Sequence, residues 1–283
     1  SLPDQWHTRD GWPVNAVYGY GKFLLDFLEH SRPGPHCAAA FDESLGSCFR
    51  NEIYPDYKRS RELPDDSLAF QLRACREISE RMGLPCYGSE RYEADDYIAT
   101  LARLYRQRNV PVTLVTRDKD LGQLLLAAED HWLDFAAGST LDAAGFQQRF
   151  GVAPHQFADY LALVGDKIDD IPGVPGVGAK TAAHLLREFG SIRQLGSRLD
   201  EVATLDIRGA RGLPQKLRDH WPQLEVAGQL TALESEIPGL DTPGKFRLNT
   251  QSVESVVDYL CELNIGGALL RRWQRLERKL SGS

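Results

Sequence analysis

Acidic residues gather in four places along the chain, and their spacing is the first feature that suggests chemistry. These residues are Asp42; Glu93, Asp95 and Asp96; Asp118 and Asp120; and Asp166, Asp169 and Asp170. Carboxylates brought close together repel one another unless cations neutralise them. Clustered oxygen ligands suit Mg²⁺ or Mn²⁺, hard ions that also bind phosphate oxygens. Together the acids predict an oxygen-rich metal site that accepts a phosphate.

Each acidic group also has a simpler explanation when taken alone. Glu93, Asp95 and Asp96 open a predicted helix, where acids complement the helix dipole. Asp118 or Asp120 could cap a helix in a solvated turn. The simpler explanation does not account for the fact that all four acidic groups lie at the ends of predicted core elements. In parallel α/β sheets, ligands gather at the carboxyl ends of strands, which favours the metal site.

A glycine-rich turn follows the last acidic group. In G-V-P-G-V-G-A-K-T, residues 173–181, Gly176 and Gly178 permit positive φ angles before a predicted helix over residues 180–189. N–H groups at such a helix start can bind a phosphate without reading base sequence. The turn does not fit G-x-x-x-x-G-K-[ST], so a nucleoside triphosphate site is not expected. Metal ions on the acids would make the same pocket attractive to phosphate.

Strands alternating with helices must position these residues in the first half of the chain. Helices are predicted over residues 15–30, 67–82 and 92–108, and strands over residues 37–42, 112–118 and 131–135. This order predicts an α/β fold with parallel pairing. In the helix over residues 67–82, we expect Leu68, Leu72, Cys75 or Ile78, and Met82 to face inward. Residues 45–66 form a long connection that contains the basic run Y-K-R-S-R, residues 57–61.

The second half of the chain has a different pattern. Short helices separated by Gly and Pro replace strand signals from about residue 141 to residue 233. A further strand is expected over residues 245–248, and two helices over residues 252–280. We therefore predict an α/β core over residues 1–140, a helical subdomain over residues 141–235 with the glycine-rich hairpin at 165–190, and a C-terminal segment, 236–283, that returns to the core.

Composition excludes several other classes of protein. The 283 residues carry a net charge of -7, which argues against coating nucleic acid by bulk attraction. Five scattered cysteines without a C-x-x-C pair indicate reduced thiols, and the histidines lack zinc-site spacing. No apolar run approaches the roughly 20 residues that span a bilayer, and no signal peptide is evident, so the cytoplasm is expected.

Read together, these motifs resemble the 5′ nuclease family, which includes the 5′ to 3′ exonuclease domain of bacterial DNA polymerase I, free-standing 5′-3′ exonucleases and flap endonucleases. The motifs occur in the family's order over nearly the whole chain. They are A-F-D ending at Asp42, Y-K-R-S-R at 57–61, Y-E-A-D-D at 92–96, the R-D-K-D that contains Asp118 and Asp120, G-D-K-I-D-D-I-P-G at 165–173 and G-V-G-A-K-T at 176–181.

The resemblance implies a PIN-like α/β core, with a mostly parallel sheet flanked by helices, and a helix-three-turn-helix subdomain that binds DNA. It implies two metal sites for Mg²⁺ or Mn²⁺. One would use Asp42, Glu93, Asp95 and Asp96, and the other Asp118, Asp120, Asp166 and Asp169. Hydrolysis would use a metal-activated water at a phosphodiester near a 5′ end, flap or nick of DNA. A monomer is expected.

The resemblance also implies roles for the basic run and for the hairpin. The run resembles the helical arch through which a free 5′ strand passes, with Tyr57 stacking on a base and Lys58 and Arg61 neutralising the scissile phosphate. A solvated basic loop is the alternative for this run. The hairpin would hold the duplex backbone, and a K⁺ ion on its loop carbonyls, through Gly173, Gly176, Val177, Gly178, Lys180 and Thr181.

Two departures from the family pattern bear on activity. Ile168, Asp169 and Asp170 stand where the family reads S-D-N, and this change keeps the aspartate. The family also begins with an apolar strand that carries a V-D-G aspartate, whereas this chain starts beyond it at S-L-P-D-Q-W. The first strand is therefore expected to be missing: either this sequence is truncated or its metal site is incomplete. The alternatives are a DNA-junction binding protein with impaired catalysis and a PIN-type ribonuclease, which the hairpin disfavours.

Overall fold

The computed structural model describes residues 6–44 and 46–282, so residues 1–5, Leu45 and Ser283, including the first residue of the predicted connection 45–66, lie outside it. The chain divides into two compact units. The first unit comprises Ser1–Glu43, Glu62–Ser89 and Asp241–Ser283, and the second comprises Ser44–Arg61 and Glu90–Leu240. None of the helices within the described residues is both long and apolar enough to cross a membrane.

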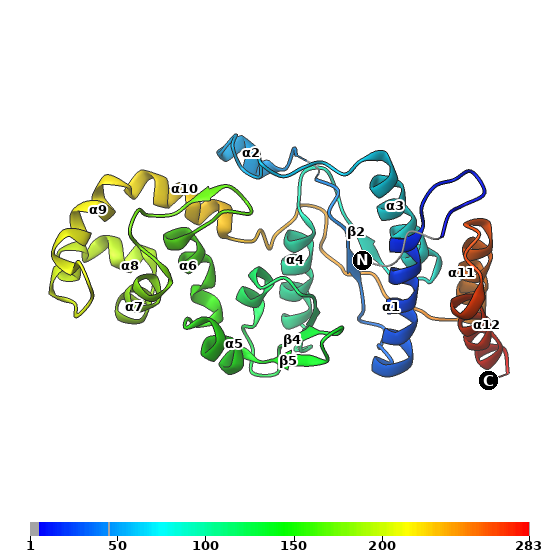
Figure 1. The fold of residues 1–283 in the computed structure, drawn as a ribbon. Helices are drawn as coiled ribbons and strands as arrows, with labels where there is room; N and C mark the ends of the chain where they lie inside the picture. Colours follow the sequence, from blue (N-terminus) through cyan, green and yellow to red (C-terminus); the bar gives the residue numbers. More distant parts are fainter. Residues whose placement is uncertain (1–5, 45, 283) are drawn as a thin grey trace. The chain divides into compact units, whose positions relative to one another are not determined.

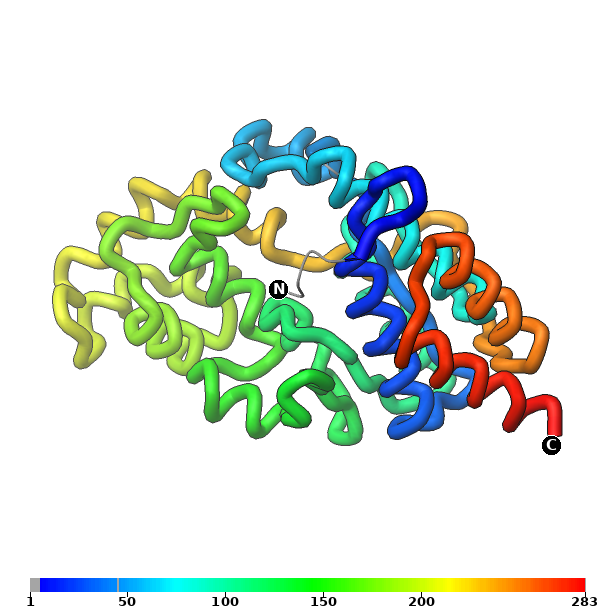
Figure 2. Tube along the Cα trace, turned by 45° about the vertical axis from the view of Figure 1, so that its right-hand side comes forward, coloured from blue at the N-terminus to red at the C-terminus, as the bar shows by residue number. Residues whose placement is uncertain are grey.

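The first unit packs four helices around one apolar core. These are α1 (Asn15–Ser31), α3 (Asp66–Arg81), α11 (Thr250–Glu262) and α12 (Gly267–Ser281). Figure 2 shows the C-terminal pair, in orange and red, beside the blue helix α1. Val17, Ile78, Val256 and Trp273 are fully enclosed in this core. The predicted helices over 15–30, 67–82 and 252–280 are confirmed to within about two residues at most ends.

A two-residue parallel ladder completes the first unit. β1 (Ala39–Ala40) pairs with β2 (Cys86–Tyr87), with Ala39 opposite Cys86. β1 lies inside the predicted strand 37–42, whereas β2 has no predicted counterpart. The strand expected over residues 245–248 is wrong, because Phe246 is buried in the core and its N–H donates to the Pro35 carbonyl without forming a ladder.

The buried face of α3 differs from the one expected. Leu68 and Leu72 are each 43% exposed, whereas Cys75, Ile78 and Met82 are buried as expected. Gln71 is buried beside α1, where its Oε1 accepts the Ala16 N–H at 2.8 Å. This polar contact and the small Ala74 define the buried side, and the two leucines lie outside it within the first unit.

The second unit contains a three-stranded sheet and most of the helices (Figure 1). β3 (Thr113–Val115) pairs in parallel with β4 (His131–Asp134), as the strands at 112–118 and 131–135 predicted. β5 (Ser139–Leu141) is antiparallel to β4. We expected one mostly parallel sheet. Among the described residues, only two strand pairs are parallel, and they belong to separate small sheets.

Helices of the second unit follow in chain order. They are α2 (Phe49–Ile53), α4 (Ala94–Arg106), α5 (Ala143–Phe150), α6 (Phe157–Val164), α7 (Ala179–Phe189), α8 (Ile192–Ser197), α9 (Leu213–Asp219) and α10 (Trp221–Thr231), with the 3₁₀ turns η1 (Asp120–Leu124), η2 (Pro154–Gln156), η3 (Leu199–Thr204) and η4 (Ala210–Gly212). Helix α6 packs against α7 and α10. Leu161, Leu185 and Leu224 share its apolar core.

Candidate active site

Three segments of the second unit bring six acidic residues together. Glu93 precedes the first turn of α4 and Asp95 lies within it; Asp118 follows β3, and Asp120 opens η1. A short antiparallel ladder carries the last two, between β6 (Gly165–Asp166) and β7 (Ile171–Pro172). We call this set the acid cluster: Glu93, Asp95, Asp118, Asp120, Asp166 and Asp169.

Two lysines bridge carboxylates within the acid cluster. Lys58 Nζ pairs with Glu93 Oε1 and lies 3.8 Å from Asp169 Oδ2. Lys119 Nζ lies 3.0 Å from Asp120 Oδ1 and 3.3 Å from Asp166 Oδ2. Each ammonium group thus occupies a position between carboxylates from different elements, where a cation is favoured.

The pKa values of the acids reflect this crowding. Loss of hydration raises the pKa of Asp95 to about 7, and the nearby Asp118 and Glu93 carboxylates add to the shift while Lys58 opposes it. Burial also raises the pKa of Asp120 and of Asp169 above the usual range, and the Asp166 carboxylate contributes to both shifts. The acid cluster therefore holds more negative charge than its lysines neutralise.

Across residues 6–44 and 46–282, no three Asp, Glu, His or Cys side chains lie close enough to share one metal ion. The lysine bridges give a local reason for this, since each ammonium lies between carboxylates that a shared ion would bring together.

Two predicted metal ligands do not belong to the acid cluster. Asp42 is an exposed residue that follows β1 in the first unit. Asp96 is completely buried, and its two oxygens accept four hydrogen bonds: from both terminal nitrogens of Arg50 and from the N–H groups of Glu93 and Glu234. Because its oxygens are already occupied, Asp96 holds the local fold together and is not positioned to bind a metal.

The role expected for Tyr57 is also corrected. Its ring is only 4% exposed, within the core of the second unit, so no base can stack on it. Its hydroxyl donates to Glu93 Oε2 at 2.9 Å. Burial raises the pKa of Tyr57 well above the usual range, so it remains a hydrogen-bond donor. Tyr57 therefore orients an acid of the cluster.

The rest of the basic run forms hydrogen bonds and an ion pair with the turn that carries Asp169. The Lys58 N–H donates to the Asp169 carbonyl at 3.0 Å, and the Ser60 N–H donates to Asp170 Oδ2 at 2.7 Å. Arg61 Nη2 lies 3.3 Å from Asp169 Oδ1. These contacts place Lys58 and Arg61 beside the acid cluster. The two motifs are far apart in the sequence, so their contact could not be inferred from their positions along the chain.

The glycine-rich turn connects α6, through β6 and β7, to α7. We call residues 173–178 the hairpin turn. A Cβ on Gly173 would lie 2.2 Å from the Val164 carbonyl oxygen, so the turn can approach the end of α6 only with glycine there. Gly176 has a φ of 84°, and Gly178 precedes the first helical residue. Lys180 is exposed and Thr181 is partly buried in the first turn of α7.

The side chain and the N–H of Val177 are engaged within the hairpin turn, and its expected part in holding K⁺ through a carbonyl stays a prediction. The Val177 side chain is 4% exposed, and its N–H donates to the Val174 carbonyl at 3.0 Å. Neither group is available to a ligand, so Val177 anchors the turn to the core. The first helical bond of α7 runs from the Ala182 N–H to the Gly178 carbonyl, so the N–H groups of residues 179–181 precede the helical ladder.

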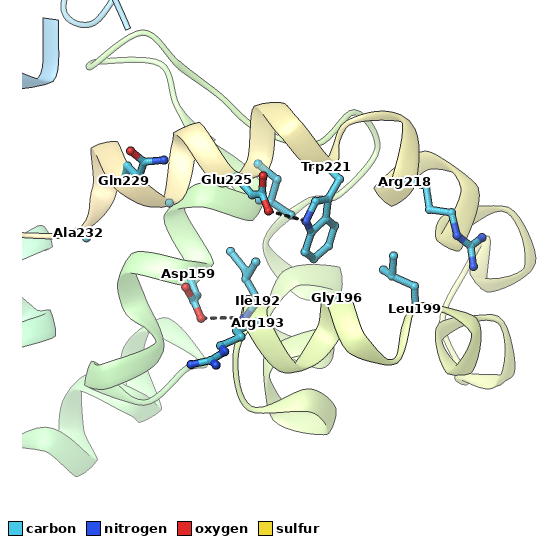
Figure 3. A pocket seen from close by; sticks show the side chains of 12 residues that line it. Asp159, Ile192, Arg193, Gly196, Leu199, Arg218, Trp221, Glu225, Gln229 and Ala232 are labelled. Atoms are coloured by element: carbon cyan, nitrogen blue, oxygen red, sulfur yellow. Dashed lines mark hydrogen bonds between the residues drawn. The ribbon is translucent and has the colours of Figure 1, made fainter. Parts of the chain in front are cut away.

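A separate cavity of about 930 Å³ lies in the helical part of the second unit (Figure 3). Its wall includes Trp221, whose Nε1 donates to Glu225 at 3.1 Å, and Asp159, which accepts the Ile192 N–H at 2.9 Å. Gly196 allows the indole to approach α8, because a Cβ there would lie 2.5 Å from the Trp221 ring. None of the residues of the acid cluster lines this cavity.

Arg50 is a functional candidate that sequence reasoning missed. It lies in α2 and is 1% exposed, and its guanidinium pairs with both Glu93 and Asp96. The local sequence C-F-R-N-E-I, residues 48–53, carries no signal that reveals partners more than 40 residues away.

Comparison with protein families matches both parts of the chain. Residues 1–151 match the model of the N-terminal resolvase-like domain of 5′-3′ exonucleases, and residues 152–254 match that of their C-terminal SAM fold. DNA polymerase I of Pseudomonas aeruginosa is 40% identical over 233 residues, covering 81% of this chain and 25% of the relative. The chain thus spans about a quarter of the length of this curated relative.

Solved structures share the fold at low sequence identity. A T5 5′-exonuclease with bound zinc ions has a TM-score of 0.62 at 20% identity, covering 95% of this chain and 92% of that chain. The catalytic core of Rad2 in complex with DNA substrate has a TM-score of 0.61 at 15% identity, covering 98% of this chain and 87% of that chain.

Proposed function

Since this chain belongs to the 5′-3′ exonuclease family, we propose that it hydrolyses phosphodiesters near the 5′ end of DNA, at flaps, nicks or free ends, during replication or repair. The observation that carries the proposal is the acid cluster, in which two ammonium groups pair with four of six carboxylates drawn from three segments of the chain. The DNA complex of the structurally similar Rad2 core supports DNA as the substrate.

The donor set fits hard divalent ions. All ligands offered by the acid cluster are carboxylate oxygens, and burial, together with neighbouring carboxylates, raises the pKa of Asp95, Asp120 and Asp169. We propose that Glu93 and Asp95 hold one Mg²⁺ or Mn²⁺ ion. Asp118, Asp120, Asp166 and Asp169 would hold the other. Bound metal would supply an activated water and neutralise phosphate charge.

The chain's own cations and backbone would bind the DNA. Lys58 and Arg61 lie beside the acid cluster, which supports a role in neutralising the phosphate whose bond breaks. The exposed Lys180 and the N–H groups at the start of α7 would hold a backbone phosphate of the duplex through the hairpin turn. Its carbonyl groups would hold the K⁺ ion that the resemblance implies.

A cleavage assay on labelled 5′-flap, nicked and single-stranded DNA tests the function directly. We expect cleavage near the 5′ end in Mg²⁺ or Mn²⁺ and none in a chelator, because the acids alone cannot activate water. Binding of flap DNA without cleavage in either metal would favour the alternative, a junction-binding protein with impaired catalysis. Failure to bind any of the three substrates would overturn both.

Metal binding should weaken as the pH falls from about 8 to about 6, because a proton on Asp95 competes with the ion. Below about pH 7 we expect a loss of up to about tenfold in Mg²⁺ affinity per pH unit. Isothermal titration calorimetry at constant ionic strength measures this slope. Asp95→Asn is the matched variant and should bind Mg²⁺ more weakly with a flatter pH profile. Equal slopes in both proteins would contradict the assignment.

The Asp95 carboxyl should also make the stability of the metal-free protein depend on pH, in the opposite direction: stability should fall as the pH rises. Because the folded pKa of Asp95 lies above its usual value, the folded state holds this proton more tightly than the unfolded chain. The contribution of this proton to the free energy of unfolding is fully present below about pH 4 and is lost as the pH rises through about 7.

A further inference from the structure

Arg50 uses all of its hydrogen-bonding capacity inside the second unit. An arginine carries five N–H donors. Nε donates to the Leu230 carbonyl at 2.9 Å, Nη1 to Glu93 Oε2 at 3.0 Å and Asp96 Oδ2 at 2.8 Å, and Nη2 to Asp96 Oδ1 at 2.7 Å and the Ala232 carbonyl at 2.9 Å. A lysine could not reproduce this planar pattern.

These bonds determine which oxygen of Glu93 is available. Glu93 Oε2 accepts from Arg50 and from the Tyr57 hydroxyl, so it is committed to the interior. Glu93 Oε1 pairs with Lys58, which also lies beside Asp169. Arg50 and Tyr57 therefore orient the carboxylate so that one oxygen faces the rest of the acid cluster.

Arg50 also joins Glu93 to the helices that adjoin the hairpin turn. Its two carbonyl partners, from Leu230 and Ala232, lie at the C-terminal end of α10, where backbone carbonyls lack helical partners and attract a cation. Between them, the Thr231 hydroxyl donates to the Ala158 carbonyl of α6 at 2.9 Å. Helix α6 leads directly into Asp166, so one buried guanidinium fixes Glu93 relative to the segment that carries Asp166 and Asp169.

We propose that Arg50 is a positioning residue that acts through Glu93, holding Glu93 Oε1 toward the metal-binding side of the acid cluster and in register with α10 and α6. The proposal rests on the proposed nuclease function. It differs from a purely structural role, in which the buried ion pairs would stabilise the fold without affecting metal binding or the chemical step.

The test compares Arg50→Lys with Arg106→Lys, a matched control in the same unit. Arg106 pairs with the fully buried Asp130 and donates to the Leu124 carbonyl, yet touches no residue of the acid cluster. Both variants should have a lower Tm. Arg50→Lys should reduce the single-turnover cleavage rate and the Mg²⁺ affinity by about tenfold or more, since charged hydrogen bonds are lost. DNA affinity should stay within about twofold, and Arg106→Lys should keep the rate and the Mg²⁺ affinity.

A double-mutant cycle with Glu93→Gln separates the two roles. If Arg50 acts through Glu93, Arg50→Lys should reduce the rate by less than about twofold further in that background. Tyr57→Phe, which removes a single bond to Glu93, should lower the Mg²⁺ affinity about threefold, and it provides the test should Arg50→Lys fail to fold.

Normal rate and Mg²⁺ affinity in Arg50→Lys, or additive losses in the cycle, would overturn the positioning role. With Arg50→Lys unfolded, an unchanged Mg²⁺ affinity in Tyr57→Phe would overturn it. These outcomes differ from failure of the proposed function itself, in which the unaltered chain would neither bind Mg²⁺ by calorimetry nor cleave DNA.

Discussion

Replacing Asp118 and Asp120 together by asparagine should abolish cleavage of a 5′ flap, with a loss of about a thousandfold or more, while duplex affinity changes by less than about threefold. Both residues belong to the acid cluster, and the hairpin turn that would hold the duplex lies on other elements. Single-turnover rates and gel-shift affinities from one preparation provide the comparison.

The control must match the change in net charge. Asp206→Asn combined with Asp241→Asn alters two exposed aspartates outside the acid cluster and should leave both rate and affinity unchanged. Equal losses of binding and cleavage in the Asp118 and Asp120 variant would contradict the division between metal-binding acids and a DNA-binding turn.

Gly173→Ala should destabilise the protein by about 3 kcal/mol or more and weaken duplex binding at the same time. The added Cβ would lie 2.2 Å from the Val164 carbonyl oxygen and 2.5 Å from the Gly165 nitrogen, and both are backbone atoms that cannot move independently. The end of α6 and the hairpin turn would have to separate. Urea unfolding followed by gel-shift titration measures both effects.

Gly228→Ala is the natural comparison for Gly173→Ala. Gly228 lies within α10, and nothing approaches within 4 Å of the position its Cβ would take. Alanine should therefore stabilise the helix by up to about 1 kcal/mol. A Gly173→Ala protein as stable as this control would mean that the turn has room for a side chain.

Features that depend on neighbouring residues can be predicted from the sequence. The apolar period of α4 and the short apolar run of β3 are local patterns, and they give the elements next to Glu93, Asp95 and Asp118 directly. The acids could be grouped because parallel strands and helix starts place their ends together. The ligand assignments themselves stay predictions.

Features that depend on distant partners could not be predicted. Arg50 binds residues 43, 46, 180 and 182 positions away, and no periodicity encodes such contacts. Tyr57 lies in a polar run that suggests exposure, yet the ring enters the core because Glu93 accepts its hydroxyl. In α3, the contact of Gln71 with the Ala16 N–H places a polar residue on the buried face that the apolar pattern had assigned to leucines.

The lysine bridges also bear on how the protein is made. A newly folded chain must bring carboxylates from α4, η1 and the β6–β7 turn together, and unscreened repulsion would oppose this. Lys58 and Lys119 are resident counter-ions, encoded in the chain and present from synthesis onward. Folding can therefore run to completion before any divalent ion arrives. Loading of the proposed site then becomes an exchange reaction, in which an ion from solution takes over carboxylates that an ammonium group has kept assembled.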